Sequence, residues 1–135
     1  MDISEGLDYV RSNSRAVIAT RRSDGAPQMS PITLAVVDDQ VVMSTRETAY
    51  KVKQLRRDPT AHLCVFPDKW LGRWIQLDCT TEIESLPSAM DTLVDYYRTL
   101  QGDHPDWDEY RQAMVDDQRC VVHFTINRAG PDRQG

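Results

Sequence analysis

Cysteine, histidine and long apolar runs are all scarce in this sequence, and each scarcity excludes a class of protein. The three cysteines, Cys64, Cys79 and Cys120, are odd in number and far apart, so they support neither a disulfide framework nor a CxxC metal site. We therefore expect a reducing, cytoplasmic location. No apolar run approaches ~18 residues, and the N-terminus lacks a basic region followed by an apolar core, so we expect neither membrane insertion nor export.

Recognisable catalytic and metal-binding patterns are missing as well. His62, His104 and His123 share no ligand spacing, which argues against a metal site. No Ser, His and Asp constellation is visible, and no pattern pairs two carboxylates across a cleft. The sequence therefore identifies no catalytic residue.

The chain does have the length and apolar content of one domain with a core. It contains 135 residues, of which 40% are hydrophobic, and carries a net charge of -5. Within this acidic chain, the segment Ser44–Pro59 is a cationic island with five basic residues and two acidic ones. Such an island indicates a small anionic ligand rather than a nucleic acid.

The cationic island combines the end of a strand with the start of a helix. The apolar run Val41–Met43 predicts the strand, Thr48 is placed to cap the next turn, and Val52 and Leu55 have helical spacing. A helix N-terminus offers unpaired backbone N–H groups to an anion. Further donors would come from Thr45, Arg46, Lys51 and Lys53.

Alternation and turn signals predict six strands, at residues 15–22, 27–37, 41–45, 61–66, 74–84 and 119–127. Helices are expected at Ile3–Ser12, at Lys51–Pro59, from Met90 through Tyr97, and from Trp107 to Asp116 behind an Asp106 cap.

Short strands at this spacing favour a small antiparallel barrel, because closure removes exposed strand edges. Pro31 within the second strand predicts an edge, a bulge or an interruption of regular pairing. We expect one domain over residues 1–127 and a loose polar tail over 128–135.

Five stretches carry a resemblance to a known family: Ala19-Thr20, Asp24–Ser30, Lys51–Pro59, Arg73–Asp78 and Asp106–Val115. The chain resembles, from about Ile3 to Ile126, the flavin-binding split-barrel proteins related to pyridoxamine 5'-phosphate oxidase. More narrowly, it is similar to the actinobacterial branch that uses the deazaflavin coenzyme F-420. The resemblance implies a mainly β fold, a six-stranded antiparallel split β-barrel with peripheral helices.

The resemblance also implies a homodimer with two cofactor sites at the subunit interface. The phosphate would lie near Thr45 and Lys51, and Arg46 or Lys53 would replace a contact that the family often draws from the position of Ala49. The ring would lie along the second strand, whose candidate residues are Gln28, Met29, Ser30, Pro31 and Ile32. Trp74 is either a wall for a planar cofactor or substrate, or a packing residue.

The function expected from this resemblance is hydride transfer between reduced coenzyme F-420 and a small organic acceptor. Such chemistry needs no protein nucleophile. Lys53, Arg56 and Arg57 would extend the positive surface toward the carboxylates of the deazaflavin tail. The alternatives are FMN in the same pocket, and a protein that binds the cofactor without turnover.

Overall fold

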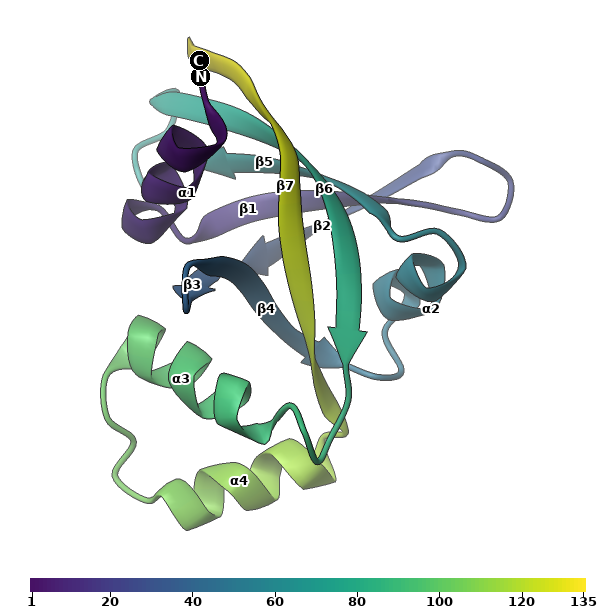
Figure 1. Cartoon of the computed structure of the whole chain (residues 1–135), viewed down its shortest axis with the longest axis vertical. Coiled ribbons are helices and arrows are strands. Elements are labelled where there is room, and N and C mark those ends of the chain that lie inside the picture. The colour runs from purple at the N-terminus through teal and green to yellow at the C-terminus, as the bar shows by residue number, and fades with distance from the viewer.

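Seven antiparallel strands form one strongly curled sheet in the computed structural model, which describes residues 1–135, and four helices pack around that sheet (Figure 1). The strands are β1 (Arg15–Arg21), β2 (Pro27–Thr33), β3 (Ala35–Val37), β4 (Gln40–Arg46), β5 (Thr60–Phe66), β6 (Arg73–Glu84) and β7 (Arg119–Gln134). The helices are α1 (Ile3–Ser12), α2 (Tyr50–Arg57), α3 (Met90–Gln101) and α4 (Trp107–Asp116). The predicted split-barrel class is confirmed.

The extra strand arises because the predicted strand 27–37 is two strands. The sheet order is β2-β1-β5-β6-β7-β4-β3, so β2 and β3 lie at opposite ends of the sheet although only the fully buried Leu34 separates them in sequence. The sheet must curl for its two ends to meet at this residue. The barrel is therefore split and not closed by a continuous hydrogen-bonded ladder, and β2 keeps a free edge, as Pro31 predicted.

The C-terminal segment is also different from the prediction. Strand β7 continues to Gln134, and its last part pairs with the start of β6, with Arg73 opposite Gln134 and Ile75 opposite Asp132. Arg73 donates to Asp132 through Nε at 2.8 Å and Nη2 at 3.0 Å. The prediction of a loose tail at 128–135 is wrong, because pairing with a distant strand orders this polar segment.

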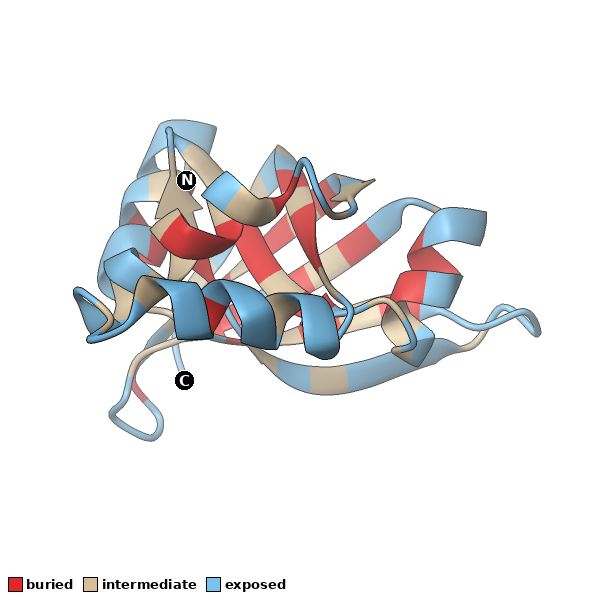
Figure 2. Cartoon of the chain, turned by 90° about the horizontal axis from the view of Figure 1, so that it is seen from below, coloured by how far each residue is buried: buried red, intermediate tan, exposed pale blue.

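The inner face of the curled sheet holds the main core. Strand β5 shows the alternation that fills it, because Ala61, Leu63 and Val65 are fully buried while His62 and Cys64 are not. A second, smaller cluster packs α3 and α4 against β3, β4 and β7. Figure 2 shows the buried residues gathered on the strands inside the barrel and on the inward sides of the helices.

The helices lie at different ends of the barrel. In Figure 1, α3 and α4 lie together at one end, α1 lies near the two chain termini at the other, and α2 lies at the side. Helix α4 begins where predicted, and the Asp106 carboxylate accepts a hydrogen bond from the backbone N–H of Glu109 at 3.1 Å. No helix has both the length and the apolar character to span a membrane.

Residues paired directly across antiparallel strands project to the same face of the sheet. The face opposite the core, here called the outer face, carries one row formed by Met29, Ala19, His62, Asp78 and Arg128 on β2, β1, β5, β6 and β7. The next row contains Pro31, Val17, Cys64 and Gln76. No helix of the chain covers this face between β2 and β5, where Met29 remains 67% exposed.

Candidate functional site

The start of α2 offers free backbone donors. Ala49 is the N-cap, and its side chain makes no capping hydrogen bond. Thr48 does not cap this turn, so that prediction is wrong. The Val52 N–H donates to the Ala49 carbonyl oxygen at 3.1 Å, but the N–H groups of Tyr50 and Lys51 have no partner, which leaves the positive end of the helix open to an anion.

Lys51 lies in this first turn and points toward β2. Its Nζ donates to the Ser30 hydroxyl oxygen at 3.1 Å, and the structure contains no ion pair that includes Lys51. The side chain is half-buried, and burial lowers the pKa of its ammonium group below the ordinary lysine value. A partly buried cation without an anionic partner, next to an uncapped helix N-terminus, fits a phosphate group.

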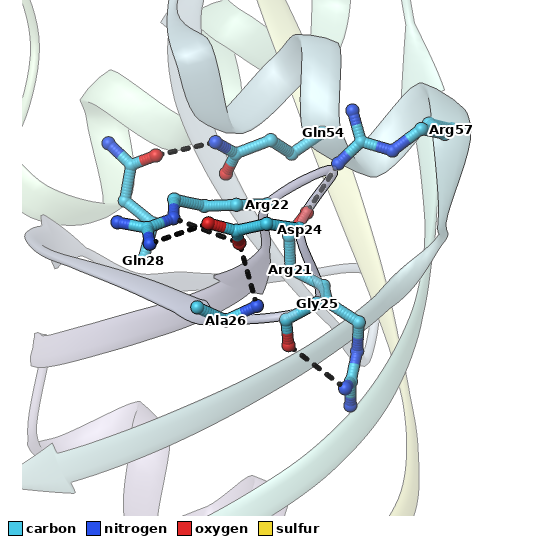
Figure 3. Close-up of polar contacts among 8 residues, drawn as sticks. All are labelled: Arg21, Arg22, Asp24, Gly25, Ala26, Gln28, Gln54 and Arg57. Atoms are coloured by element: carbon cyan, nitrogen blue, oxygen red, sulfur yellow. Dashed lines mark hydrogen bonds and ion pairs between the residues drawn. The ribbon is translucent and has the colours of Figure 1, made fainter.

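Behind Lys51, a buried polar network ties α2 to β1 and β2. Thr20 and Gln54 are only 4% and 8% exposed. The Thr20 hydroxyl donates to Gln54 Oε1. Gln54 Nε2 in turn donates to Gln28 Oε1 (Figure 3). Both buried groups are therefore satisfied, and Gln28 is held beside the helix.

The hairpin between β1 and β2 is anchored to the same helix. Arg57 Nη2 donates to the Arg21 carbonyl oxygen at 2.6 Å (Figure 3). Within the turn, the Asp24 carboxylate accepts from the Ala26 backbone N–H at 2.9 Å and pairs with Arg22 at 2.9 Å. These contacts make the hairpin and α2 one continuous unit around Gln28 and Ser30.

Comparison with known proteins identifies the family that carries this arrangement. The pyridoxamine 5'-phosphate oxidase family model matches residues 5–130. The chain belongs to this family. It is a family of flavin- and deazaflavin-binding oxidoreductases with the split-barrel fold.

Solved structures show the same fold at low sequence identity. The conserved hypothetical protein Rv2991 of Mycobacterium tuberculosis is 23% identical, with a TM-score of 0.78 over 96% of this chain and 82% of the other. An F-420 reductase is 17% identical, with a TM-score of 0.67 over 91% of this chain and 94% of the other. An FAD-binding protein of Mesorhizobium loti is 14% identical, with a TM-score of 0.68 over 96% and 92%.

Within this family member, the structure divides the five candidate residues of β2 between two faces. Gln28 and Ser30 face α2, and Ile32 packs against the main core. Met29 and Pro31 lie on the outer face. A ligand bound along β2 would therefore meet polar groups on one side of an edge strand and apolar groups on the other.

The remaining candidate residues near α2 have unequal surroundings. Thr45 is buried at the end of β4. Arg46 is exposed, lies opposite Arg119 across the β4–β7 pair, and is 3.7 Å from the Asp117 carboxylate. Lys53 is exposed and forms no ion pair.

Two other cations of α2 have partners within the protein. Arg56 pairs with Glu47 at 2.7 Å, and Arg57 is held by the Arg21 carbonyl. The predicted cationic path for a cofactor tail is therefore reduced to Lys53 on this helix.

Trp74 lies apart from Lys51 in a single chain. It is on the outer face of β6, three strands from β2 in the sheet order. Together with Phe66 and Trp70, it lines an apolar cavity of about 560 Å³, a volume typical of small-molecule sites. Its lining also contains Lys69 and the ion pair between Arg15 and Asp68, whose Nε and Oδ1 atoms are 3.2 Å apart.

Thr20 and Gln54 are the site residues that the sequence interpretation missed. Gln54 follows Lys51 by three positions, so the two side chains lie on the same side of α2. That spacing was a usable signal. The burial of Thr20 against Gln54 depends on how the helix packs on β1, which no local pattern reveals.

Proposed function

We propose that this family member is a coenzyme F-420-dependent oxidoreductase that transfers a hydride between the reduced deazaflavin and a small organic acceptor. The observation that carries the proposal is the half-buried Lys51 without an anionic partner at the uncapped start of α2. When bound, the deazaflavin supplies the hydride.

The chain's own residues would bind and orient the cofactor. Lys51, the Ser30 hydroxyl and the first-turn N–H groups of α2 would hold the phosphate. The free edge of β2 presents unpaired backbone N–H and C=O groups, which can bind the polar rim of a planar ring.

FMN is the second candidate cofactor, because its phosphate would use the same residues. The exposed and unpaired Lys53 favours the deazaflavin, whose tail carries extra carboxylates. Because Arg56 and Arg57 are engaged elsewhere, this preference would rest on one exposed cation and should weaken as salt rises.

We also propose that two copies associate through the outer face. Met29, Pro31 and Val17 form an apolar surface there that the chain itself leaves uncovered. Trp74 is three strands from β2 in one chain, so its contact with a cofactor at β2 would come from the second copy.

The proposal is tested by titrating the purified protein with coenzyme F-420 and, separately, with FMN. Lys51→Ala should weaken binding of the preferred cofactor by roughly 1.5 to 3 kcal/mol, the range for a hydrogen bond to a charged group. Lys53→Ala is the matched control, since it removes a cation from the same helix outside the Ser30 contact. Equal affinities of wild type and Lys51→Ala for both cofactors would remove the phosphate site.

The same titrations separate the alternatives. Tighter binding of FMN than of F-420 at low salt would reassign the cofactor. Binding of F-420 without reduction of any tested acceptor would identify a cofactor-binding protein without turnover.

A further inference from the structure

Two histidines in this structure pair with carboxylates, but they differ in how many ring nitrogens are used. His123 is engaged on both sides, with Nδ1 at 2.8 Å from Gln40 Oε1 and Nε2 at 2.8 Å from Glu84 Oε1. His62 is engaged only through Nδ1, which lies 2.7 Å from Asp78 Oδ1. Its Nε2 has no hydrogen-bond partner in the protein, and its side chain is 42% exposed.

The surroundings of Asp78 determine which nitrogen of His62 carries the proton. Burial by itself would raise the pKa of the Asp78 carboxyl, but hydrogen bonds from Gln76 and His62 outweigh it and lower that pKa below its ordinary value. Asp78 is therefore a carboxylate at neutral pH and only accepts hydrogen bonds. The His62 Nδ1–H must donate to it, which leaves Nε2 as the reactive nitrogen.

The free nitrogen lies on the same outer-face row as the exposed part of β2. His62 is opposite Ala19, and Ala19 is opposite Met29, so the two larger residues are two strands apart, or about 10 Å between Cα atoms. Only the small Ala19 side chain lies between them in this row. A hollow of about 160 Å³ adjoins this point and is lined by His62, Ala19 and the β1–β2 hairpin.

We propose that the His62–Asp78 pair is the proton donor to the acceptor molecule, which would bind between His62 and the ring along β2. The proposal rests on the oxidoreductase function proposed above. An acceptor that gains a hydride gains two electrons and one proton, and a negative charge with them. His62 Nε2–H then gives the second proton, the neutral imidazole remains bound to Asp78, and water reprotonates it.

Charged groups on three strands surround the His62 imidazole. Asp78 faces His62 from β6, Arg128 lies beyond Asp78 on β7, and Arg21 lines the hollow from β1. The outer-face residues of β2 beside the hollow carry no charge.

The test compares His62→Gln and Asp78→Asn with His123→Gln, a matched histidine that has no free nitrogen. With F-420 and an acceptor reduced by the wild type, His62→Gln should lower kcat about 100-fold, the scale of general acid catalysis. The dependence of kcat on pH should differ between His62→Gln and the wild type. The dissociation constant for F-420 should change less than about twofold, and His123→Gln should keep near-wild-type kcat.

A second readout needs no cofactor. Long-range ¹⁵N NMR of the histidine rings should show the neutral His62 protonated on Nδ1, and Asp78→Asn should mix the two neutral forms and lower kcat. The proton-donor role would be overturned if His62→Gln kept the wild-type kcat and pH profile, or if the neutral His62 ring were protonated on Nε2. In either case, binding of F-420 by the wild type would leave the oxidoreductase proposal standing. Failure of the wild type to bind F-420 would overturn both.

Discussion

The inner and outer faces of the curled sheet are built from the same strands but serve different purposes. On β5, Leu63 is 0% exposed in the main core, whereas the adjacent Cys64 is exposed on the outer face. The inner face is filled by the chain's own side chains, whereas the outer face carries the proposed binding surface. Because successive side chains of a strand point to opposite faces, the residues that stabilise the fold are separate from those of the proposed binding surface.

The largest expected effect comes from truncating a residue of the inner face, compared with its neighbour on the outer face. Leu63→Ala should reduce the free energy of unfolding by about 2 to 5 kcal/mol, because it leaves a cavity in a packed core. Cys64→Ala should change it by about 0.5 kcal/mol or less. Urea unfolding of both variants measures the difference. Similar losses in the two would mean that the faces do not differ as described.

The buried polar network should give a smaller effect. Thr20→Val removes the hydroxyl that donates to Gln54 and leaves a buried amide oxygen without that partner, which should cost about 1 to 3 kcal/mol of stability. Thr125→Val, at an exposed strand position, is the control and should stay within about 0.5 kcal/mol. Denaturant unfolding checks both, and equal stabilities would show that the network contributes nothing.

A charge on the outer face should break the proposed dimer without unfolding the chain. Cys64→Lys should raise the dimer dissociation constant at least about tenfold, or about 1.4 kcal/mol, because the ammonium group would lose water in the interface. Light scattering at micromolar concentration should show the wild-type dimer and more monomer for the variant. A monomeric wild type would remove the interface from the proposal.

The smallest expected effect concerns acid stability at the Asp78 carboxyl. Its pKa is lowered in the folded protein, so its contribution is present above the unfolded value and is lost as pH falls through the folded value. The stability gap between wild type and Asp78→Asn, about 1 kcal/mol near neutral pH, should therefore shrink below about pH 4. Glu82→Gln is the exposed control. A gap that stayed constant down to pH 2 would contradict the assigned ionisation.

Local sequence signals predicted the elements that depend on near neighbours. The bounds of α1 and α4 and the Asp106 cap follow from residues within one or two turns, and the structure has them where expected. The cationic segment around Lys51 was likewise visible in sequence. A family resemblance carried by short motifs then indicated the split barrel before any strand pairing was known.

Only the tertiary structure decided which distant residues meet. The break at Leu34 and the ordering of 128–134 follow from how the sheet curls, because each depends on pairing with strands far away in sequence. The partners of Arg56 and Arg57 and the buried contact of Thr20 with Gln54 depend on the docking of α2. The His62–Asp78 pair is set by the register of β5 against β6, and a shift by one residue would place those side chains on opposite faces.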